Sequence, residues 1–561
     1  MNGRHGRLQG WRGCGPAVAG VLALTLAAAP RAAAFGVQLS NDARLDWETT
    51  VSYGFAVRAA GQSLTGLNND VNKDDGNRSF ERWDPVANRF SLLSEADLQW
   101  RDFGVFVRGT AFYDFVYMGK SNNDSPGTHN SFQGNGGSLD DSKKFNDDVE
   151  WSVGTRVELL DAFLYGEFEP AGAPTQVRVG RQVVNWGESL FLIGGVGTSQ
   201  NPLDATKLNT PGTELKEVFL PTGQVYAQTT LAEVFTLAGF YKWEWDETRL
   251  NEAGTFFSTS DFLFEAGETI LVPIPGVGNL SIDHVDDHEP ADTGEWGVST
   301  RYYSEALEGT EFGLYYLNYT EKIPMVKFRP TGGSYNSPHG GPWSDLVGAV
   351  PGLTAETAAQ LDYVDGSSYY LDYAENVQLV GFSVSGAVGD ANIGAEIVYR
   401  WDYPVAVNSS NPANLLKIDY EKAAMVRAVL NGLHLWGETF LSDAGTLTWE
   451  VGMDRVNGYS SAELANDKIA WGGAVKLNLT YFQVLPALDL DVPITLIVNP
   501  EGTSSYTGSF MEDSDSLAIG LNFTYNSVWK LDFTYTNYLH DTDRNPKADR
   551  DWLGVNLKYT F

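Results

Sequence analysis

The segment LGVNLKYTF, residues 553–561, alternates strictly between two kinds of side chain. Leu553 and every second residue after it are apolar or aromatic, and the residues between them are small or polar. Because successive side chains of a β-strand point to opposite faces, this segment predicts a strand with one apolar and one polar face. Such a strand can separate a lipid phase from water.

The same period of two recurs elsewhere in the chain. It is clear over residues 45–57, 90–101, 103–115, 517–525 and 531–535. After residue 34, no run reaches the roughly 18 consecutive apolar residues of a transmembrane helix. We therefore predict an all-β fold, a transmembrane antiparallel β-barrel, with a soluble β-sandwich as the alternative.

Short and long connections alternate between the expected strands. Eight short ones fall near residues 102, 170–175, 232–233, 304–309, 389–390, 441–445, 485–490 and 526–527. Nine long polar ones fall near 59–89, 119–154, 187–222, 247–294, 320–376, 403–420, 457–470, 499–514 and 540–550. This alternation predicts about 18 strands, with the turns on the periplasmic side and the long loops outside. About 16 strands is the alternative, because boundaries inferred from alternation are imprecise by several residues.

The first 34 residues differ from the rest of the sequence. A basic start is followed by an apolar run from Ala17 to Ala29 and by three small residues that end at Ala34. This order predicts a signal peptide over 1–34 and a barrel over 35–561 in the outer membrane of a Gram-negative bacterium. The apolar alternation that ends at Phe561 resembles the signal recognised by outer-membrane assembly machinery. We expect that machinery, outer-membrane lipids and lipopolysaccharide as partners.

The charge balance restricts the partners of the mature chain. Removal of residues 1–34 takes away four arginines and no acidic residue, so the formal net charge moves from −34 to −38. A surface this acidic argues against nucleic acid as a partner, because phosphate binding needs a basic face. The only cysteine, Cys14, lies in the expected signal peptide, so we expect neither disulfides nor thiolate chemistry in the barrel.

The third long connection, residues 187–222, is less charged than the other loops and mixes apolar with polar residues. This composition predicts a loop that folds into the barrel lumen as a constriction or partial plug, with an ordinary surface loop as the alternative. Residues in and around this loop, together with others from 243–257, are the candidate contacts for a ligand. They are Trp186, Glu188, Phe191, Asn201, Asp204, Lys207, Phe219, Trp243, Trp245, Arg249 and Phe256.

Charged residues occupy the polar face of the first expected strands. A tight turn at Asp102 would place Asp97 roughly opposite Arg108. Such pairs either tune the selectivity of a pore or neutralise one another in a wet interior. The candidate lumen charges are Arg44, Glu95, Asp97, Arg101, Arg108 and Asp114.

Two further patterns concern metal binding and catalysis. Asp70, Asn72, Asp74 and Glu81 have the spacing of positions 1, 3, 5 and 12 of a calcium loop, although Asp75 stands where that loop needs glycine. The alternative is a solvated acidic loop, and apart from this calcium we expect no cofactor. The sequence contains neither a G-x-S-x-G nor an H-E-x-x-H motif, so we do not expect an enzyme.

The segment GRQVVNWGE, residues 180–188, resembles the domain-of-unknown-function 1302 (DUF1302) family of proteobacterial proteins. The resemblance continues at 201–217 and returns over 245–258 and 294–315. It implies an outer-membrane protein encoded beside a periplasmic carrier-like family (DUF1329) and an inner-membrane transporter. These two are therefore expected partners on an envelope-crossing path for a hydrophobic compound.

The leading prediction is a barrel channel or transporter. It would move a hydrophobic or amphipathic small molecule, such as a lipid, steroid or hydrocarbon-like compound, across the outer membrane. One alternative is a general or ion-selective porin. Another is a structural or assembly partner of a periplasmic lipid carrier, and a barrel enzyme is the last.

Overall fold

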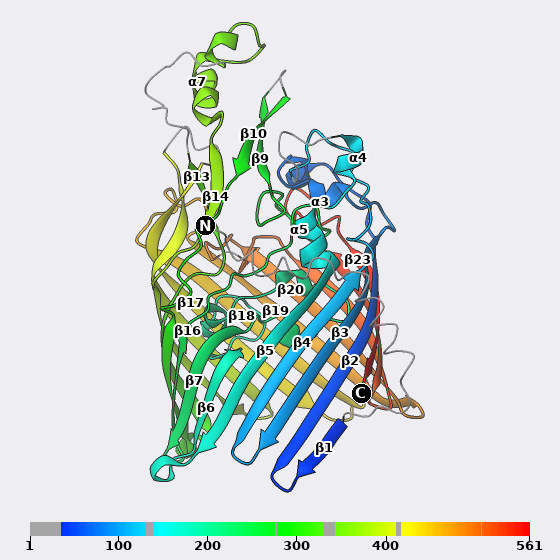
Figure 1. Ribbon diagram of the computed structural model, residues 1–561, viewed down its shortest axis with the longest axis vertical. Helices are drawn as coiled ribbons and strands as arrows, with labels where there is room; N and C mark the ends of the chain where they lie inside the picture. The colour runs from blue at the N-terminus through cyan, green and yellow to red at the C-terminus, as the bar shows by residue number, and fades with distance from the viewer. Residues whose placement is uncertain (1–34, 131–137, 275–277, 330–342, 411–416, 507) are drawn as a thin grey trace.

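The computed structural model describes residues 35–130, 138–274, 278–329, 343–410, 417–506 and 508–561. Eighteen antiparallel strands form a closed barrel, which confirms the predicted fold and strand number (Figure 1). The predicted signal peptide, residues 1–34, lies outside the described residues. The barrel strands are β2 (Ala43–Arg58), β3 (Pro85–Trp100), β4 (Phe103–Asp114), β5 (Thr155–Phe168), β6 (Thr175–Gln182), β7 (Thr222–Leu231), β8 (Phe235–Lys242), β11 (Trp296–Ser304), β12 (Thr310–Tyr319), β15 (Val377–Val388), β16 (Ala391–Asn408), β17 (Ile418–Trp436), β18 (Ala444–Asn457), β19 (Ile469–Leu485), β20 (Leu488–Glu501), β21 (Ser516–Tyr525), β22 (Trp529–Tyr538) and β23 (Trp552–Thr560).

The barrel closes between its first and last strands. Residues 552–560 of β23 pair antiparallel with residues 50–58 of β2. Thr49 and Phe561 then exchange main-chain hydrogen bonds of 2.7 and 2.9 Å. Beyond this point β1 (Phe35–Ser40) continues along the same edge of β2. Closure matters because an unpaired strand edge cannot satisfy its polar groups in lipid.

The alternation in the sequence separates the two faces of the wall. In β23, Leu553 and Leu557 are exposed on the outer face, whereas Gly554 and Asn556 point inward and are buried. The other strands follow the same rule, so the outer surface carries the apolar band of a transmembrane barrel. Its large exposed aromatic residues include Trp47, Trp100, Phe103, Tyr241, Trp243, Trp296, Tyr399, Trp471, Trp529 and Tyr535.

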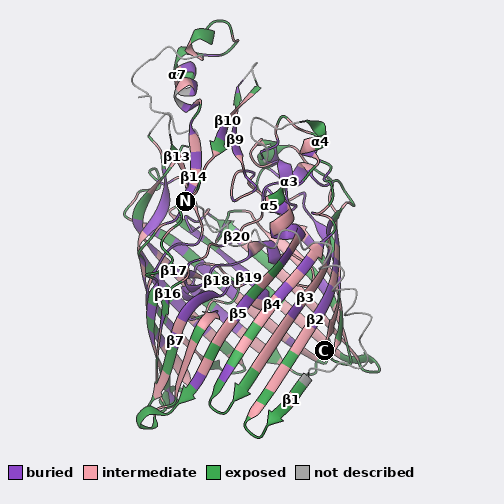
Figure 2. Cartoon of the chain, in the orientation of Figure 1, coloured by how far each residue is buried: buried purple, intermediate pink, exposed green. Residues whose placement is uncertain are grey.

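The short turns lie at one end of the barrel and the long loops at the other (Figure 1). Asn526 and Ser527, in the turn between β21 and β22, have positive φ angles of 50° and 61°. Two successive left-handed residues are what a tight hairpin turn requires. Figure 2 shows exposed residues along these turns and buried residues concentrated where the loops meet the barrel.

Above the mouth, two of the long loops build a small separate sheet. Its strands are β9 (Thr269–Ile274), β10 (Gly278–His284), β13 (Met325–Arg329) and β14 (Ser368–Asp372), in the order β13–β14–β10–β9. Ala358 and Leu361 of helix α7 (Ala355–Val364) pack against Ile274 of this sheet. Among the described residues, no helix is long and apolar enough to cross a membrane.

The remaining helices are single turns within the connections. The α-helical ones are α3 (Asp75–Arg78), α4 (Leu139–Ser142), α5 (Asp147–Val149) and α6 (Val196–Gln200). The 3-10 turns are Gly66–Asn69, Pro170–Gly172, Ala205–Lys207, Leu215–Glu217, Glu305–Leu307 and Ser344–Leu346, and Glu150–Gly154 is a π turn.

Candidate functional site

The connection between β6 and β7, residues 183–221, runs across the inside of the barrel, and we call it the lumen loop. Part of it is held by Glu450, a buried residue in the middle of β18. The Glu450 carboxylate accepts a hydrogen bond from Ser189 Oγ at 2.7 Å and further ones from the three main-chain N–H groups of residues 190–192. Because Glu450 lies in mid-strand, these bonds place the loop at membrane depth, as predicted.

Two other charged residues of the wall secure the same part of the loop. Glu396 in β16 accepts hydrogen bonds from the N–H groups of Glu188 (2.8 Å) and Val196 (2.9 Å). Arg400, fully buried in the same strand, donates to the carbonyl oxygen of Gly194. Hydrogen bonds to charged groups stabilise by about 1.5–3 kcal/mol each, so these contacts fix the loop strongly.

The second half of the lumen loop reaches the wall formed by β2–β5. Asp204 forms a buried ion pair of 2.6 Å with Arg156 of β5. Gly54 of β2 allows the loop to pass close to the wall, because a Cβ at this position would lie 2.8 Å from Pro211 O. The loop is therefore fastened to two separate parts of the wall.

Between the charged residues of β16 and β18, the wall that faces the first half of the lumen loop carries apolar side chains. Trp186 and Val196 of the loop belong to a buried cluster with inward-facing side chains of the strands from β7 to β18. The ring centroid of Trp186 lies 5.2 Å from that of Phe240 and 6.1 Å from that of Tyr315. On this side the barrel interior is packed like a protein core. Other members of the cluster are Leu317, Tyr319, Val377, Leu379, Val398, Tyr403, Val405, Met425 and Val456.

The periplasmic half of the lumen differs from this packed extracellular half. In the periplasmic half of β19–β23 the inward-facing residues are small or polar and remain partly exposed. Since these side chains point away from the lipid, their exposure means that water reaches them inside the barrel. The inward-facing Asn392, Thr446 and Thr448 of β16 and β18 are likewise polar and accessible, so the lumen is filled toward the extracellular end and open toward the periplasm. The residues of the open half include Asn478, Thr480, Asp491, Thr495, Asn522, Asp532 and Thr534.

The lumen loop also exposes large apolar side chains inside the barrel. The main chain of residues 190–192 is bonded to Glu450 in mid-strand. Lys216 donates to Glu95 in the periplasmic half of β3, which places the neighbouring Leu215 at that depth. These side chains share one loop, and exposed apolar side chains inside a barrel can provide a binding surface for a ligand. They are Leu190 (52 % exposed), Phe191 (38 %), Leu208 (52 %) and Leu215 (70 %).

Three long loops cover the extracellular mouth above β2–β5 and β22–β23. We call their described residues, within 59–84, 115–154 and 243–268, the mouth cover. Phe80 in the first loop packs against Tyr117 and Phe145 in the second and Phe256 in the third, with ring centroids 6.1, 6.2 and 5.6 Å apart. This apolar cluster also contains Trp552 of the barrel wall.

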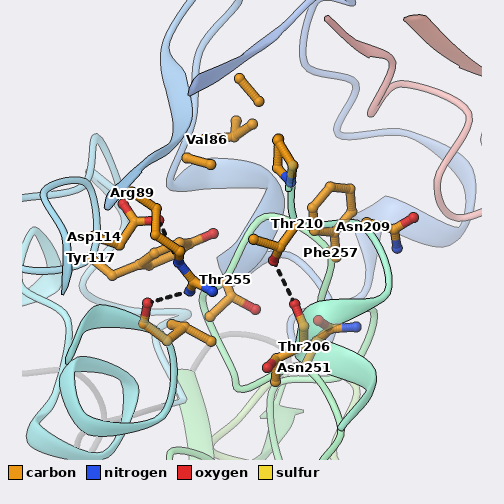
Figure 3. Close-up of a pocket in the computed structure, with 14 residues that line it drawn as sticks. Val86, Arg89, Asp114, Tyr117, Thr206, Asn209, Thr210, Asn251, Thr255 and Phe257 are labelled. Atoms are coloured by element: carbon orange, nitrogen blue, oxygen red, sulfur yellow. Dashed lines mark hydrogen bonds and ion pairs between the residues drawn. The ribbon is translucent and has the colours of Figure 1, made fainter. Parts of the chain in front are cut away.

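A small cavity lies where the mouth cover meets the lumen loop. Its volume is about 20 Å³, which is enough for a water molecule. Figure 3 shows Arg89 beside Asp114 on the barrel side, while Thr206 and Thr210 of the lumen loop share a hydrogen bond of 2.9 Å. A larger molecule could pass this point only if the loops moved.

Most of the candidate ligand residues hold the loops in place. Asn201 Nδ2 donates to Val184 O at 2.6 Å, and Arg249 forms an ion pair of 2.6 Å with Glu158 of β5. The main-chain N–H of Glu188 donates to Glu396. Phe219 is half-buried and forms an isolated β-bridge with Leu203. Phe191, in contrast, combines an apolar ring with exposure inside the barrel. The buried candidates are Trp186, Asn201, Asp204, Lys207, Trp245 and Phe256.

The prediction that Trp243 lines the lumen is wrong. The side chain is 42 % exposed and follows the outward alternation of Leu237 and Tyr241 in β8, which are also exposed. The inward-facing neighbours Phe240 and Lys242 are buried. Trp243 therefore belongs to the outer aromatic residues and faces lipid.

The predicted pairing of Asp97 with Arg108 is also wrong. Arg108 lies opposite Glu95 and bonds to its carboxylate at 2.7 Å, and it forms a second ion pair of 2.7 Å with Asp161 of β5. Asp97 instead accepts a hydrogen bond from Tyr165 OH at 2.8 Å. The charges on this part of the wall neutralise one another.

The remaining candidate lumen charges are spread along the barrel. Arg101 lies in the turn between β3 and β4, where it pairs with Asp42 at 3.0 Å, so it is at the periplasmic rim. Arg44 lies at the same end and pairs with Asp46 at 2.8 Å, and both side chains are exposed. Asp114, at the opposite end of β4, is buried in the wall. These residues do not form one selectivity site.

The four residues of the predicted calcium loop do not come together. Asp70 pairs with Lys73 at 3.0 Å, and both side chains are exposed. Asn72 Oδ1 already accepts two hydrogen bonds, and Glu81 is exposed. Asp74 is the one member of the four that lies in a group of close carboxylates.

The sequence analysis missed the charged residues of β16–β18 that hold the lumen loop. Glu396 and Arg400 flank Val398 in the inward-facing row of β16, and Arg427 is an isolated charge between Met425 and Val429 in that of β17. An isolated charge in an apolar inward row requires a fixed partner, because burial of an unpaired charge is costly. That pattern could have identified the wall that faces the loop.

The closed barrel, its apolar outer band and its inward-folded loop define a class, the transmembrane β-barrels of outer-membrane type. Within that class, the chain belongs to the family described as "Protein of unknown function (DUF1302)", which matches residues 15–561. A search of curated proteins finds no match.

Several solved structures are similar to the chain at low identity. OccAB1 of Acinetobacter baumannii has 8 % identity and a TM-score of 0.43, with 92 % of this chain and 96 % of that chain covered. OccAB3 of the same organism has 10 % identity and a TM-score of 0.41, with coverages of 92 % and 99 %. OpdL of Pseudomonas aeruginosa has 9 % identity and a TM-score of 0.38, with coverages of 92 % and 98 %.

Proposed function

We propose that the protein is an outer-membrane channel for a hydrophobic or amphipathic small molecule, such as a lipid, steroid or hydrocarbon-like compound. The lumen loop would form its binding surface and its gate. The observation that carries this proposal is the group of exposed apolar side chains on the loop, of which Leu215 at 70 % is the most exposed.

The physical argument rests on the contrast between this loop and a wet pore. Apolar surface in contact with water is unfavourable by about 25 cal/mol per Å². A ligand that covers about 200 Å² of it would gain about 5 kcal/mol before the costs of association are subtracted. The polar walls of the periplasmic half would accommodate the polar end of an amphipathic ligand. Apolar side chains of the loop beside a wet polar wall therefore suit a molecule with two kinds of surface.

Passage between the mouth cover and the lumen loop requires a rearrangement, because a water-sized cavity lies at this contact. The lumen loop is attached to the wall through a few charged residues, of which Glu450 and Arg400 make the most hydrogen bonds. Displacement of the loop at these two points would connect the open periplasmic half of the lumen to the mouth. We infer a gated barrel with a small resting conductance.

Binding of the fluorescent apolar probe N-phenyl-1-naphthylamine to the purified protein tests the proposal. We expect saturable binding that weakens several-fold in the double variant Phe191→Ser and Leu215→Ser. The matched control is Leu139→Ser, an exposed leucine of α4 outside the barrel, and it should bind as the wild type does. Equal probe binding by all variants would refute the lumen surface. A large steady ion conductance of the wild type in planar bilayers would favour a general porin.

A further inference from the structure

Three aspartates from two distant parts of the chain meet in the mouth cover. Asp74 and Asp75 lie at the start of α3, and Asp261 lies in the loop after β8. One carboxylate oxygen of each lies within 4.8 Å of one from each of the others, and all three residues are buried. Two oxygens that bind one Ca²⁺ from opposite sides at about 2.4 Å are about 4.8 Å apart, so the spacing fits a single ion.

Buried oxygen atoms at this cluster have no hydrogen-bond donor. No described residue donates to Asp261 Oδ1 or to Asn130 Oδ1, and both residues are fully buried. Asn130 adjoins the carboxylates, because its main-chain N–H donates to Asp75 Oδ2 at 2.8 Å. The main-chain N–H of Asp75 in turn donates to Asp261 Oδ2 at 3.0 Å. Buried oxygens are normally satisfied, so these atoms point to a ligand that supplies positive charge.

The cationic side chains nearby do not neutralise the cluster. Arg78 forms an ion pair of 2.5 Å with Asp74 alone. Arg550 directs its hydrogen bonds to two main-chain carbonyl oxygens, those of Phe256 and Ser258. Among the described arginines and lysines, Arg78 is thus the one that pairs directly with any of the three carboxylates.

We propose that Asp74, Asp75 and Asp261 bind one Ca²⁺ ion, which joins two loops of the mouth cover over the barrel. The ligands are all oxygen atoms, which favours a hard cation, and Ca²⁺ tolerates irregular geometry better than Mg²⁺ does. The side-chain oxygen of Asn130 and water would complete its coordination. The site lies outside the lumen, so it stands independently of the proposed transport.

Calcium titration of the purified full-length barrel, stripped with a chelator, tests this site by calorimetry. We expect one Ca²⁺ per chain and a higher melting temperature in calcium than in chelator. Asp261→Asn should weaken calcium binding at least tenfold. In chelator the same variant should melt at or above the wild-type temperature, because it removes one of the repelling carboxylates.

The matched control is Asp286→Asn, an exposed aspartate of the same long connection, which should bind calcium as the wild type does. If Asp261→Asn fails to fold, the wild-type titration and Asp74→Asn still decide the question. Absence of calcium uptake by the stripped wild type would overturn the proposal, as would equal affinity of the Asp261→Asn variant. Uptake of Mg²⁺ but not Ca²⁺ would overturn the assignment to calcium.

Discussion

Replacement of Glu450 by glutamine should weaken the attachment of the lumen loop to the wall. The carboxylate accepts three main-chain hydrogen bonds from residues 190–192 and one from Ser189 Oγ. An amide keeps one acceptor oxygen but has no charge and directs an NH₂ group at N–H donors. The contribution of each of the three main-chain hydrogen bonds to docking then falls from about 2 to about 1 kcal/mol, so the docked position of the loop is destabilised by about 3 kcal/mol. The undocked fraction should therefore rise more than 100-fold, since every 1.4 kcal/mol is a factor of ten.

Single-channel recording in planar lipid bilayers measures this change directly. We expect the Glu450→Gln variant to show frequent large conductance steps that are rare in the wild type. Glu438→Gln serves as the control, because this glutamate is exposed in the periplasmic turn between β17 and β18.

Equal opening of the variant and its control would contradict the role of Glu450 in holding the loop closed. If the folded Glu450→Gln barrel opened no more often than Glu438→Gln, the carboxylate would not hold the loop in its resting position. The same result would weaken the case for the lumen loop as the gate, while the probe-binding test would remain valid.

Three further predictions concern the wall, the loops and the lipid face. Gly54→Ala should destabilise the docked position of the second half of the lumen loop by about 1–3 kcal/mol, because the new Cβ would lie 2.8 Å from Pro211 O. Bilayer recordings should show a smaller increase in opening than for Glu450→Gln. Burial raises the pKa of Glu247 to about 8, so near neutral pH the folded state holds a proton that the unfolded state releases. The free energy of unfolding should therefore fall by up to about 5 kcal/mol as the pH rises from about 4.5 to 8. Denaturant titrations should show a flatter pH dependence for Glu247→Gln. Leu521→Lys, on the lipid face of β21, should cost about 2–4 kcal/mol of unfolding free energy, whereas its lumen-facing neighbour Asn522→Lys should cost little.

The barrel was predictable because its main determinant is local. Alternation of two kinds of side chain assigns each residue of a strand to lipid or lumen without knowledge of the fold. Turns such as Asn526-Ser527 are equally local, because their short length leaves few conformations. The number and direction of the strands follow from counting the alternating segments and the turns between them.

Contacts inside the lumen were less predictable because they depend on register and on distant residues. The turn between β3 and β4 is centred one residue earlier than expected, at Arg101 and Asp102, and this moves the partner of Arg108 from Asp97 to Glu95. The bond between the Phe191 N–H and Glu450 joins residues 259 apart, and no local pattern reports it.

The three close aspartates illustrate the same limit of local spacing. A calcium loop is recognised by ligands at fixed offsets within one segment. Here the packing of separate loops brings Asp261 to Asp74 and Asp75, and offsets within one segment do not report such a group. Only the folded chain places these residues together.

The apolar side chains inside β12 and β15–β18 should couple the lumen loop to assembly of the barrel. In a barrel with a wet interior, the strands can close before the loops settle. Here Leu379, Val398 and Met425 belong to one buried cluster with Trp186 and Val196 of the loop, so this cluster is incomplete until the loop is in place. Strand closure and loop insertion should therefore occur in one cooperative step, with residues 183–221 acting as an internal template. Deletion of the lumen loop should give a barrel that fails to close, not a wider pore.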